Sequence, residues 1–376
     1  MKILHINCNY MTTALHQTMV EHLESLGIEN CVFAPVYDAK RAVVNPNNNV
    51  IVSQCFKKWD RIWFGYKQKN IYKALIHTIN PEDFNCIHAY TLFTDGNCAL
   101  ELSKKYGKPF VVAVRDTDVN IFFKSMPHLR GRGIKIMRHA SRVFFLSTTY
   151  RDYVIDKYVP QRYKDEILKK SMIFPNGIDS FWFENSYTNR NIPKTKQQFE
   201  KKYIKIIYAG RINNNKNPVA TLKAMDVLEK MGYQTEFVVV GEFFDNSIKK
   251  ILLSDKLVRY VVKLDKSKLI ELYRNNDIFV MPSYNETFGL VYAEAMSQGL
   301  PVLYTKGQGF DGQFPDGEVG YAIDPYSPED IANKIICAMQ NYESINMNCI
   351  QRYQKFYWNR ITDEYLTVYT EILGHK

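Results

Sequence analysis

Short apolar runs alternate with amphipathic stretches along almost the whole chain. The run 110–114, Phe-Val-Val-Ala-Val, is rich in β-branched residues, which is typical of a central strand in a parallel sheet. Before it, the strand-like run 2–6 leads into an amphipathic helix over 12–26 that Gly27 ends. Strands that alternate with helices in this way predict a doubly wound parallel sheet, and therefore an α/β fold.

This alternation occurs twice. Further strands are expected in the second half at 204–209, 237–240, 261–264, 278–281, 302–304 and 321–323. Between the halves lie a Pro-Asn-Gly-Ile-Asp turn at 175–179 and a polar, aperiodic stretch over 186–202 that is typical of a linker. The pattern predicts two Rossmann-like domains, 1–180 and 181–357, whose parallel sheets face each other across a cleft. An aromatic closing helix is expected over 358–373.

The composition restricts the class of protein. Hydrophobic residues make up 46% and charged residues 23% of the 376 residues, which is typical of a soluble globular protein. No apolar run approaches the length of a membrane span, and no long apolar signal region precedes the first strand. The seven cysteines form no Cys-x-x-Cys pair, so neither a zinc site nor a disulfide framework is indicated. We therefore expect reduced thiols and a cytoplasmic protein.

The loop after the apolar run 278–281 carries the most informative polar residues. Glu286 lies between the end of this strand and a helix expected over 288–298, which is where open α/β sheets bind ligands. The N–H groups at the helix start form a seat for an anion, and they belong to Thr287, Phe288, Gly289 and Leu290. Glu294 follows on the same face of the helix. Two hydroxyl-accepting carboxylates beside a phosphate seat predict a nucleotide-sugar site, and the alternative is two ordinary helix glutamates.

A second polar loop follows the strand expected at 204–209. It contains Arg211 and Lys216, and Pro218 then suits the first turn of the next helix. Arginine offers a planar fork for a phosphate group, and lysine offers a point charge. Together they could neutralise a diphosphate leaving group without a metal. The alternative is a pair of solvated loop cations.

A third group of polar residues follows the strand expected at 110–114. Asp116 and Asp118 form an Asp-x-Asp pair of the kind that holds Mn²⁺ or Mg²⁺ in metal-dependent sugar transferases, although the cation Arg115 would compete with a metal. In a second interpretation, Arg115 and Asp118 orient an acceptor, and in a third they form a buried ion pair. His88, at the end of another strand, is either a residue of the cleft or a core histidine.

The net charge of +10 is unevenly distributed. The segment 124–142 contains no acidic residue and six basic ones, Lys124, Arg130, Arg132, Lys135, Arg138 and Arg142, interleaved with apolar side chains. One interpretation is a patch that contacts an anionic partner, which would be lipid head groups or an anionic acceptor. The other interpretation is a solvated helix face beside a phosphate-binding cleft. No nucleic-acid-binding motif accompanies the charge, so nucleic acid is not an expected partner.

Taken together, several motifs resemble those of the family-4 glycosyltransferases, which adopt the GT-B fold. The resemblance rests on the block from Glu286 to Glu294 with Phe-Gly-Leu inside it, on Gly210-Arg211 with Lys216, on the turn at 175–179, and on Tyr357-Trp358 at the last helix. It covers most of the chain. It implies a retaining transferase that uses a nucleotide-diphosphate sugar and no metal.

The resemblance also implies roles for single residues. Glu286 would hold the donor sugar hydroxyls, and the N–H groups of Phe288, Gly289 and Leu290 would line the sugar and phosphates. Arg211 and Lys216 would take the diphosphate, and Glu294 the ribose. Asn176 would lie near the crossing between the domains. The last helix would return to the first domain, which adds 358–376 to it.

The chain departs from the family pattern in two places. Met11-Thr12-Thr13-Ala14 stands where the family carries Gly-Gly, and Arg115 stands where many members carry a histidine. Because arginine cannot act as a base at neutral pH, activation of the acceptor by a histidine is in doubt. The departing phosphate oxygen can take the acceptor proton instead, and Asp118 is the other candidate base.

We therefore expect an enzyme that moves a sugar from a UDP- or GDP-sugar to a hydroxyl of a glycan or lipid-linked glycan, in the synthesis of a bacterial surface polysaccharide or glycoconjugate. It would work in the cytoplasm or on the inner face of the plasma membrane. Two alternatives remain open at this point. One is a non-catalytic, membrane-associated scaffold with the same fold, and the other is a metal-dependent transferase that uses Asp116 and Asp118.

Overall fold

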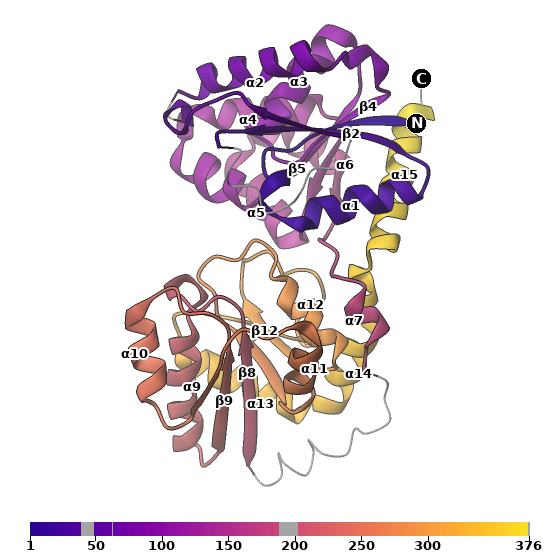
Figure 1. Cartoon of the computed structure of the whole chain (residues 1–376). Coiled ribbons are helices and arrows are strands. Elements are labelled where there is room, and N and C mark those ends of the chain that lie inside the picture. Colours follow the sequence, from indigo (N-terminus) through magenta and orange to yellow (C-terminus); the bar gives the residue numbers. More distant parts are fainter. Residues whose placement is uncertain (39–48, 62, 188–201, 375–376) are drawn as a thin grey trace. The chain divides into compact units, whose positions relative to one another are not determined.

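The computed structural model describes residues 1–38, 49–61, 63–187 and 202–374, so most of the expected linker lies outside the described residues. The chain forms two compact units (Figure 1). The first unit comprises Met1–Leu146, Tyr150–Gly177 and Trp358–Lys376, and the second comprises Ser147–Thr149 and Ile178–Tyr357. The chain thus leaves the first unit close to the boundary placed at 180 and returns to it at Trp358.

The first unit contains a seven-stranded sheet whose strand pairs are all parallel. In sheet order its strands are β3 (Val50–Gln54), β2 (Glu29–Val36), β1 (Lys2–Ile6), β4 (Cys86–Ala89), β5 (Phe110–Val114), β6 (Arg142–Phe145) and β7 (Ser171–Ile173). Its helices are α1 (Ala14–Ser25), α2 (Phe64–Thr78), α3 (Thr94–Tyr106), α4 (Arg130–His139), α5 (Thr148–Tyr158), α6 (Gln161–Lys170) and α15 (Trp358–Gly374).

Different helices cover the two faces of this sheet (Figure 1). Successive side chains of a strand point to opposite faces, so Val112 of β5 packs in the core with α2, α3 and α4, whereas Val111 packs in the core with α1 and α15. Helix α15 buries Trp358, Ile361, Tyr365, Val368 and Tyr369 in that second core. Trp358 packs on Gly177, where a Cβ atom would lie 2.4 Å from the indole, so this turn requires glycine for packing.

The second unit contains a six-stranded parallel sheet. In sheet order its strands are β10 (Val258–Val261), β9 (Gln234–Val240), β8 (Tyr203–Ala209), β11 (Ile278–Met281), β12 (Val302–Thr305) and β13 (Gly320–Ile323). Its helices are α7 (Phe181–Glu184), α9 (Pro218–Lys230), α10 (Asn246–Ser254), α11 (Lys266–Arg274), α12 (Leu290–Ser297), α13 (Pro328–Gln340) and α14 (Tyr342–Arg352).

The two sheets confirm the expected α/β class, and two boundaries need correction. The strand expected at 261–264 is β10, three residues earlier, because Val258–Val261 pairs with the last residues of β9 while Val262 is exposed. The helix expected from 288 begins at Leu290.

Within the described residues, no helix combines the length and the hydropathy that crossing a bilayer requires.

Candidate active site

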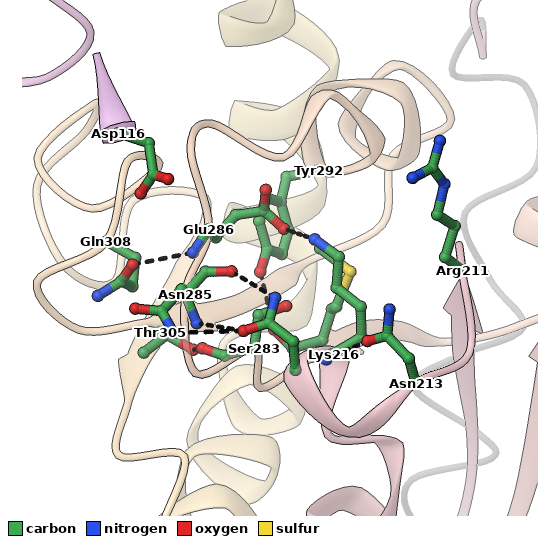
Figure 2. A network of polar contacts seen from close by, with 12 residues as sticks. Asp116, Arg211, Asn213, Lys216, Ser283, Asn285, Glu286, Tyr292, Thr305 and Gln308 are labelled. Carbon is green, nitrogen blue, oxygen red and sulfur yellow. Dashed lines mark hydrogen bonds and ion pairs between the residues drawn. The ribbon is translucent and has the colours of Figure 1, made fainter. Parts of the chain in front are cut away.

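Three loops meet at one edge of the second unit's sheet (Figure 2). They follow β8, β11 and β12, which are neighbours in this parallel sheet, so their carboxyl ends lie side by side. The chain runs from β8 to β9 on one side, whereas β11 lies on the other side of β8. This change of direction is the switch point at which open α/β sheets bind ligands.

A buried ion pair, Lys216–Glu286, lies at this edge. Figure 2 shows the ammonium group of Lys216 against the carboxylate of Glu286. Glu286 is only 9% exposed, so little solvent screens the two charges. Lys216 ends the short 3-10 helix η7 (Asn214–Lys216), and its N–H donates to Asn213 Oδ1 at 3.0 Å. The fold therefore joins two predicted site residues that come from different loops.

Asn215 ties these two loops together. Its Oδ1 accepts a hydrogen bond from the N–H of Asn285 at 3.1 Å, and its Nδ2 donates to the carbonyl oxygen of Asn285 at 2.9 Å. The N–H of Tyr284 donates to the Asn215 carbonyl at 2.8 Å. Sequence reasoning missed this residue, because the middle of an Asn-Asn-Asn run looks like solvated loop.

The loop after β12 supports Glu286 from the other side. Gln308 Oε1 accepts a hydrogen bond from the N–H of Glu286 at 2.9 Å, and the N–H of Gly309 donates to the Glu286 carbonyl at 3.0 Å. A Cβ atom at position 309 would lie 1.7 Å from the Thr287 carbonyl oxygen, so only glycine allows this approach. No local pattern in the sequence predicts a role for this loop, although glycines soon after a strand can mark such a close approach.

The predicted anion seat lies in the loop rather than in the first turn of the helix. Gly289 has φ +76°, and its left-handed backbone precedes the first residue of α12. In the part of the chain that the structure describes, the N–H groups of Thr287, Phe288 and Gly289 donate to no acceptor. Phe288 is buried among other aromatic rings, which holds this loop in place. Three free N–H groups therefore lie within three residues of Glu286.

Arg211 does not join the ion pair. Its side chain is exposed, and its guanidinium lies 5.8 Å from the centre of the Phe244 ring. Figure 2 shows this guanidinium apart from Lys216, with no hydrogen bond to the other residues drawn. Its carbonyl oxygen accepts from the Tyr208 hydroxyl at 2.7 Å, which fixes the backbone of the loop. The structure therefore places Arg211 on the predicted loop but leaves its charge in solvent.

Glu294 lies on α12 and has different neighbours from Glu286. Burial raises the pKa of Glu294 to about 7, while nearby Lys266 opposes the shift. Lys266 begins α11 and forms a second ion pair, at 2.5 Å, with Asp179 of the predicted Pro-Asn-Gly-Ile-Asp turn. The two predicted carboxylates therefore lie in separate environments, one beside the loop after β8 and one beside α11.

The chain matches two protein-family profiles, one in each half. Residues 189–356 match the profile "Glycosyl transferases group 1", and residues 17–180 match "Glycosyltransferase Family 4". The chain belongs to the group 1 glycosyltransferases. This confirms the family that the sequence motifs resemble.

Two relatives of this glycosyltransferase match over most of its length. The D-inositol 3-phosphate glycosyltransferase of Paenarthrobacter aurescens is 25% identical over 310 residues, which are 77% of this chain and 74% of the relative. The alpha-monoglucosyldiacylglycerol synthase of Acholeplasma laidlawii is 23% identical over 345 residues, which are 86% of this chain and 83% of the relative.

Solved structures share the architecture of this glycosyltransferase. Sucrose-phosphate synthase from Thermosynechococcus elongatus matches with a TM-score of 0.74 and 18% identity over 100% of both chains. The Anabaena protein HepE, in complex with UDP-glucose, matches with a TM-score of 0.65 and 17% identity, also over 100% of both chains. The GT-B fold expected from the sequence is thereby confirmed.

The candidate acceptor residues of this glycosyltransferase lie in the first unit. Arg115 follows β5, and its Nη1 donates to Asn176 Oδ1 at 3.1 Å. Its Nε is buried and has no acceptor among the described residues, and burial lowers the pKa of its guanidinium. The hydrogen bond between Arg115 and Asn176 joins two of the predicted residues. It places the Arg115 guanidinium at the carboxyl end of this sheet.

The carboxylate of Asp118 is held by backbone N–H groups of the first unit. Its carboxylate accepts hydrogen bonds from the N–H groups of Leu92, Phe93 and Arg115 at 3.0, 3.1 and 2.9 Å. Burial raises the pKa of Asp118 to about 6, although these N–H groups oppose the shift. The interpretation as a side-chain ion pair with Arg115 is corrected, because Asp118 binds the Arg115 backbone instead.

The Asp-x-Asp pair does not form a preorganised metal site. Asp116 Oδ1 accepts from Asn120 Nδ2 at 2.6 Å and from the Tyr150 hydroxyl at 3.2 Å, while both oxygens of Asp118 accept backbone N–H groups. In the described part of the chain, no group of three or more His, Cys, Asp or Glu residues could hold a metal ion.

His88 lies in the core rather than in a cleft. It is fully buried in β4, and its Nδ1 lies 2.6 Å from the Tyr369 hydroxyl of α15. Its ring also stacks on Tyr90 at 4.3 Å. The closing helix covers this strand, which the local sequence does not reveal, so the core interpretation is the correct one.

Of the two interpretations of the basic segment 124–142, the structure supports the solvated helix face rather than the apolar and basic patch. Its apolar residues Ile134, Ile136 and Met137, like Phe123 just before the segment, belong to the core of the first unit and are not available to a membrane. Arg138 pairs with Glu166 at 2.9 Å, and Arg142 pairs with Glu371 at 3.4 Å. Lys124, Arg132 and Lys135 remain exposed. Most of the segment is therefore a helix with one buried face and one charged, solvated face.

Proposed function

We propose that this glycosyltransferase moves a sugar from a UDP- or GDP-sugar to a hydroxyl of a glycan or lipid-linked glycan, with retention of configuration and without a metal. The observation that carries the proposal is the buried Lys216–Glu286 pair beside three free N–H groups at the switch point of the second sheet. A carboxylate accepts sugar hydroxyls, while N–H groups and a lysine stabilise negative charge on phosphate.

The steps follow from this arrangement. The loop 287–289 would seat the diphosphate, and Lys216 would then stabilise the charge that develops on the leaving phosphate. Glu286, held by Lys216 and Gln308, would orient the sugar hydroxyls, and Glu294 would accept the ribose hydroxyls. Arg211 would turn from solvent toward the diphosphate. The acceptor proton would pass to the leaving phosphate oxygen, because Asp118 is already bound by three N–H groups.

The names of relatives support a range of acceptors and donors. D-inositol 3-phosphate glycosyltransferase and alpha-monoglucosyldiacylglycerol synthase point to polyol and lipid acceptors, and HepE was solved with UDP-glucose. A lipopolysaccharide outer core galactosyltransferase, WaaB, shares the fold with a TM-score of 0.70, which fits a role in bacterial surface glycoconjugates. None of the seven cysteines, all of which lie in the described residues, forms a disulfide, which fits work on the cytoplasmic side of a membrane.

The donor assignment is tested by thermal shift with UDP, GDP and their glucose, galactose and mannose conjugates. A ligand at about 100 times its Kd should stabilise the folded state by about 2.7 kcal/mol. Glu286→Ala should abolish transfer while the protein still melts cooperatively. Transfer at the wild-type rate by that variant would contradict the assignment.

Retention and independence from metal are tested with the best donor. The anomeric proton coupling of the isolated product, measured by NMR, should match that of the donor. EDTA should leave the rate unchanged, because the Asp116 and Asp118 carboxylates already bind protein donors. A product of inverted configuration, or a rate restored only by Mn²⁺ or Mg²⁺, would refute the respective part of the proposal.

A further inference from the structure

Three polar side chains at the carboxyl end of the first unit's sheet each have a buried nitrogen atom without a hydrogen-bond partner among the described residues. These atoms are Asn7 Nδ2, His16 Nδ1 and Arg115 Nε. We propose that this cluster binds an acidic group, a carboxylate or a phosphate, on the sugar acceptor. The inference rests on the proposed function, because it gives the acceptor of that same reaction a chemical class.

The pleat of the sheet places Asn7 and Arg115 on the same face. On β1, Ile3 packs in the core with α1 and α15, and Asn7 lies four residues further on, an even step that returns to that face. On β5, Ala113 packs in the same core, and Arg115 follows two residues later. Both strands pair with β4, so their carboxyl ends lie one strand apart.

His16 reaches the same place from the first turn of α1. Its ring packs edge-on against Tyr90, which follows β4, with 4.8 Å between the ring centres. Burial, and after it the charge of Arg115, lowers the pKa of His16 to about 3, so the ring is neutral and its Nδ1 can carry a hydrogen. The first turn of α1 contains no acidic residue, and its N–H groups favour an anion.

The positive charge of Arg115 has no carboxylate in contact with it in the part of the chain that the structure describes. The guanidinium donates from Nη1 to the neutral amide oxygen of Asn176 at 3.1 Å. Asp118 attracts the guanidinium, but both carboxylate oxygens of Asp118 accept backbone N–H groups instead. Buried donors and charges without partners are unfavourable, and native proteins commonly satisfy them with a ligand or solvent.

An acidic group fits this cluster better than a neutral hydroxyl group does. The oxygens of one carboxylate or phosphate accept several hydrogen bonds, so a single group could take both Arg115 Nε and Asn7 Nδ2. A sugar hydroxyl would leave the charge of Arg115 uncompensated. Because the fork of an arginine matches carboxylate and phosphate alike, the geometry defines the chemistry that the two share.

Calorimetric titration of the full-length protein distinguishes the two groups. Saturating UDP first fills the donor site, and NaCl keeps the ionic strength constant. The probes are D-glucuronate, glucose 6-phosphate and inorganic phosphate, with glucose as the neutral control. We expect glucuronate or glucose 6-phosphate to bind at least about tenfold more tightly than glucose, because hydrogen bonds to charged groups are the stronger ones. The tighter of the two identifies a carboxylate-bearing or a phosphorylated acceptor.

Isosteric variants separate this cluster from net charge. Asn7→Asp keeps the oxygen that accepts from the Asn9 N–H but replaces the free Nδ2 with a second oxygen, so it should weaken binding of the acidic probe about tenfold or more. Asn9→Asp, at an exposed position two residues away, makes the same change of charge and should bind like the wild type. Arg115→Gln should weaken binding to a similar extent, whereas Arg162→Gln, at an exposed position of α6, should not.

Several outcomes would overturn the proposal. These are acidic probes that bind no more tightly than glucose, wild-type affinity in both Asn7→Asp and Arg115→Gln, and an equal loss in Asn9→Asp. Binding of inorganic phosphate alone would mean an adventitious ion only. Loss of the acidic probe in Lys216→Met, with retention in Arg115→Gln, would place the anion in the donor site. The titrations are repeated without UDP, so that failure of UDP to bind counts against the donor assignment alone.

Discussion

Replacing Lys216 with methionine should separate the stabilising role of the buried ion pair from its role toward a donor. Methionine keeps the length of the side chain but removes the cation that faces Glu286. The side chains of Lys216 and Glu286 are 21% and 10% exposed, so the carboxylate would remain in a poorly solvated place without that cation.

The magnitude follows from this burial. Removing one partner from a fully buried pair costs about 3–5 kcal/mol, whereas an exposed pair is worth about 0–1 kcal/mol. The partial exposure of Lys216 places Lys216→Met between these limits, at about 2 kcal/mol. Glu286→Gln should cost about 1 kcal/mol, because the flexible lysine can extend toward water. For a unit of this size, about 2 kcal/mol corresponds to a Tm lower by about 4–8 °C.

The assay is a double-mutant cycle by calorimetry, followed by titration with UDP. The double variant Lys216→Met/Glu286→Gln should lose about 1 kcal/mol less than the sum of the two single variants. UDP should raise the Tm of the wild type but have little effect on any variant that lacks Lys216. Lys249→Met, at an exposed lysine of α10, is the matched control and should change neither quantity.

Two results would refute this reasoning. Additive losses would mean that the two charges are not coupled, and the contact would then be an ordinary surface pair. A wild-type response to UDP in Lys216→Met would show that the diphosphate binds elsewhere, whatever the variant's stability. The first result concerns the folded protein alone, and the second concerns the donor site alone.

Three further predictions concern residues with a defined environment. Gly309→Ala should remove UDP binding, measured by calorimetric titration, because its Cβ atom would lie 1.7 Å from the Thr287 carbonyl oxygen; unchanged affinity would contradict the close approach. Burial raises the folded-state pKa of Glu294 to about 7 from its usual 4.5, so its contribution to stability is present at low pH and is lost as the pH rises through this range. Glu294→Gln should therefore flatten the loss of stability toward urea between about pH 4.5 and about pH 7, and an unchanged slope would argue against the raised pKa of this carboxyl. Asp118→Asn should lower the unfolding free energy by about 2 kcal/mol, because hydrogen bonds from three N–H groups to a charged group are weakened, while residual transfer activity persists; full stability with no activity would instead identify a base.

Much of the fold could be predicted because its signals are local. The apolar run of β5 needs only its own residues to indicate a central parallel strand, and the spacing along 358–373 indicates one buried face of α15. The alternation of such segments predicts two parallel sheets. Errors of a few residues, as at β10, arise where an edge strand depends on its pairing with a neighbour rather than on its own composition.

The candidate site was predictable where a residue type and a strand end coincide. Glu286 and Lys216 each follow a strand, and both lie at the switch point. Asn215, Gln308 and Gly309 could not be found in this way, because their roles are contacts between loops that are far apart in sequence. Arg211 was assigned to the diphosphate by its position in the loop, and the direction of its side chain is not encoded there.

The sequence by itself determined the α/β class, the repeat of the pattern and the residues that could bind a nucleotide-sugar, because periodicity and chemical type are properties of short segments. Only the tertiary structure decided which loops meet at the switch point, that α15 covers His88, and that the apolar residues of 124–142 lie in the core. Strand order and burial depend on contacts between distant segments, so no local pattern could have settled them.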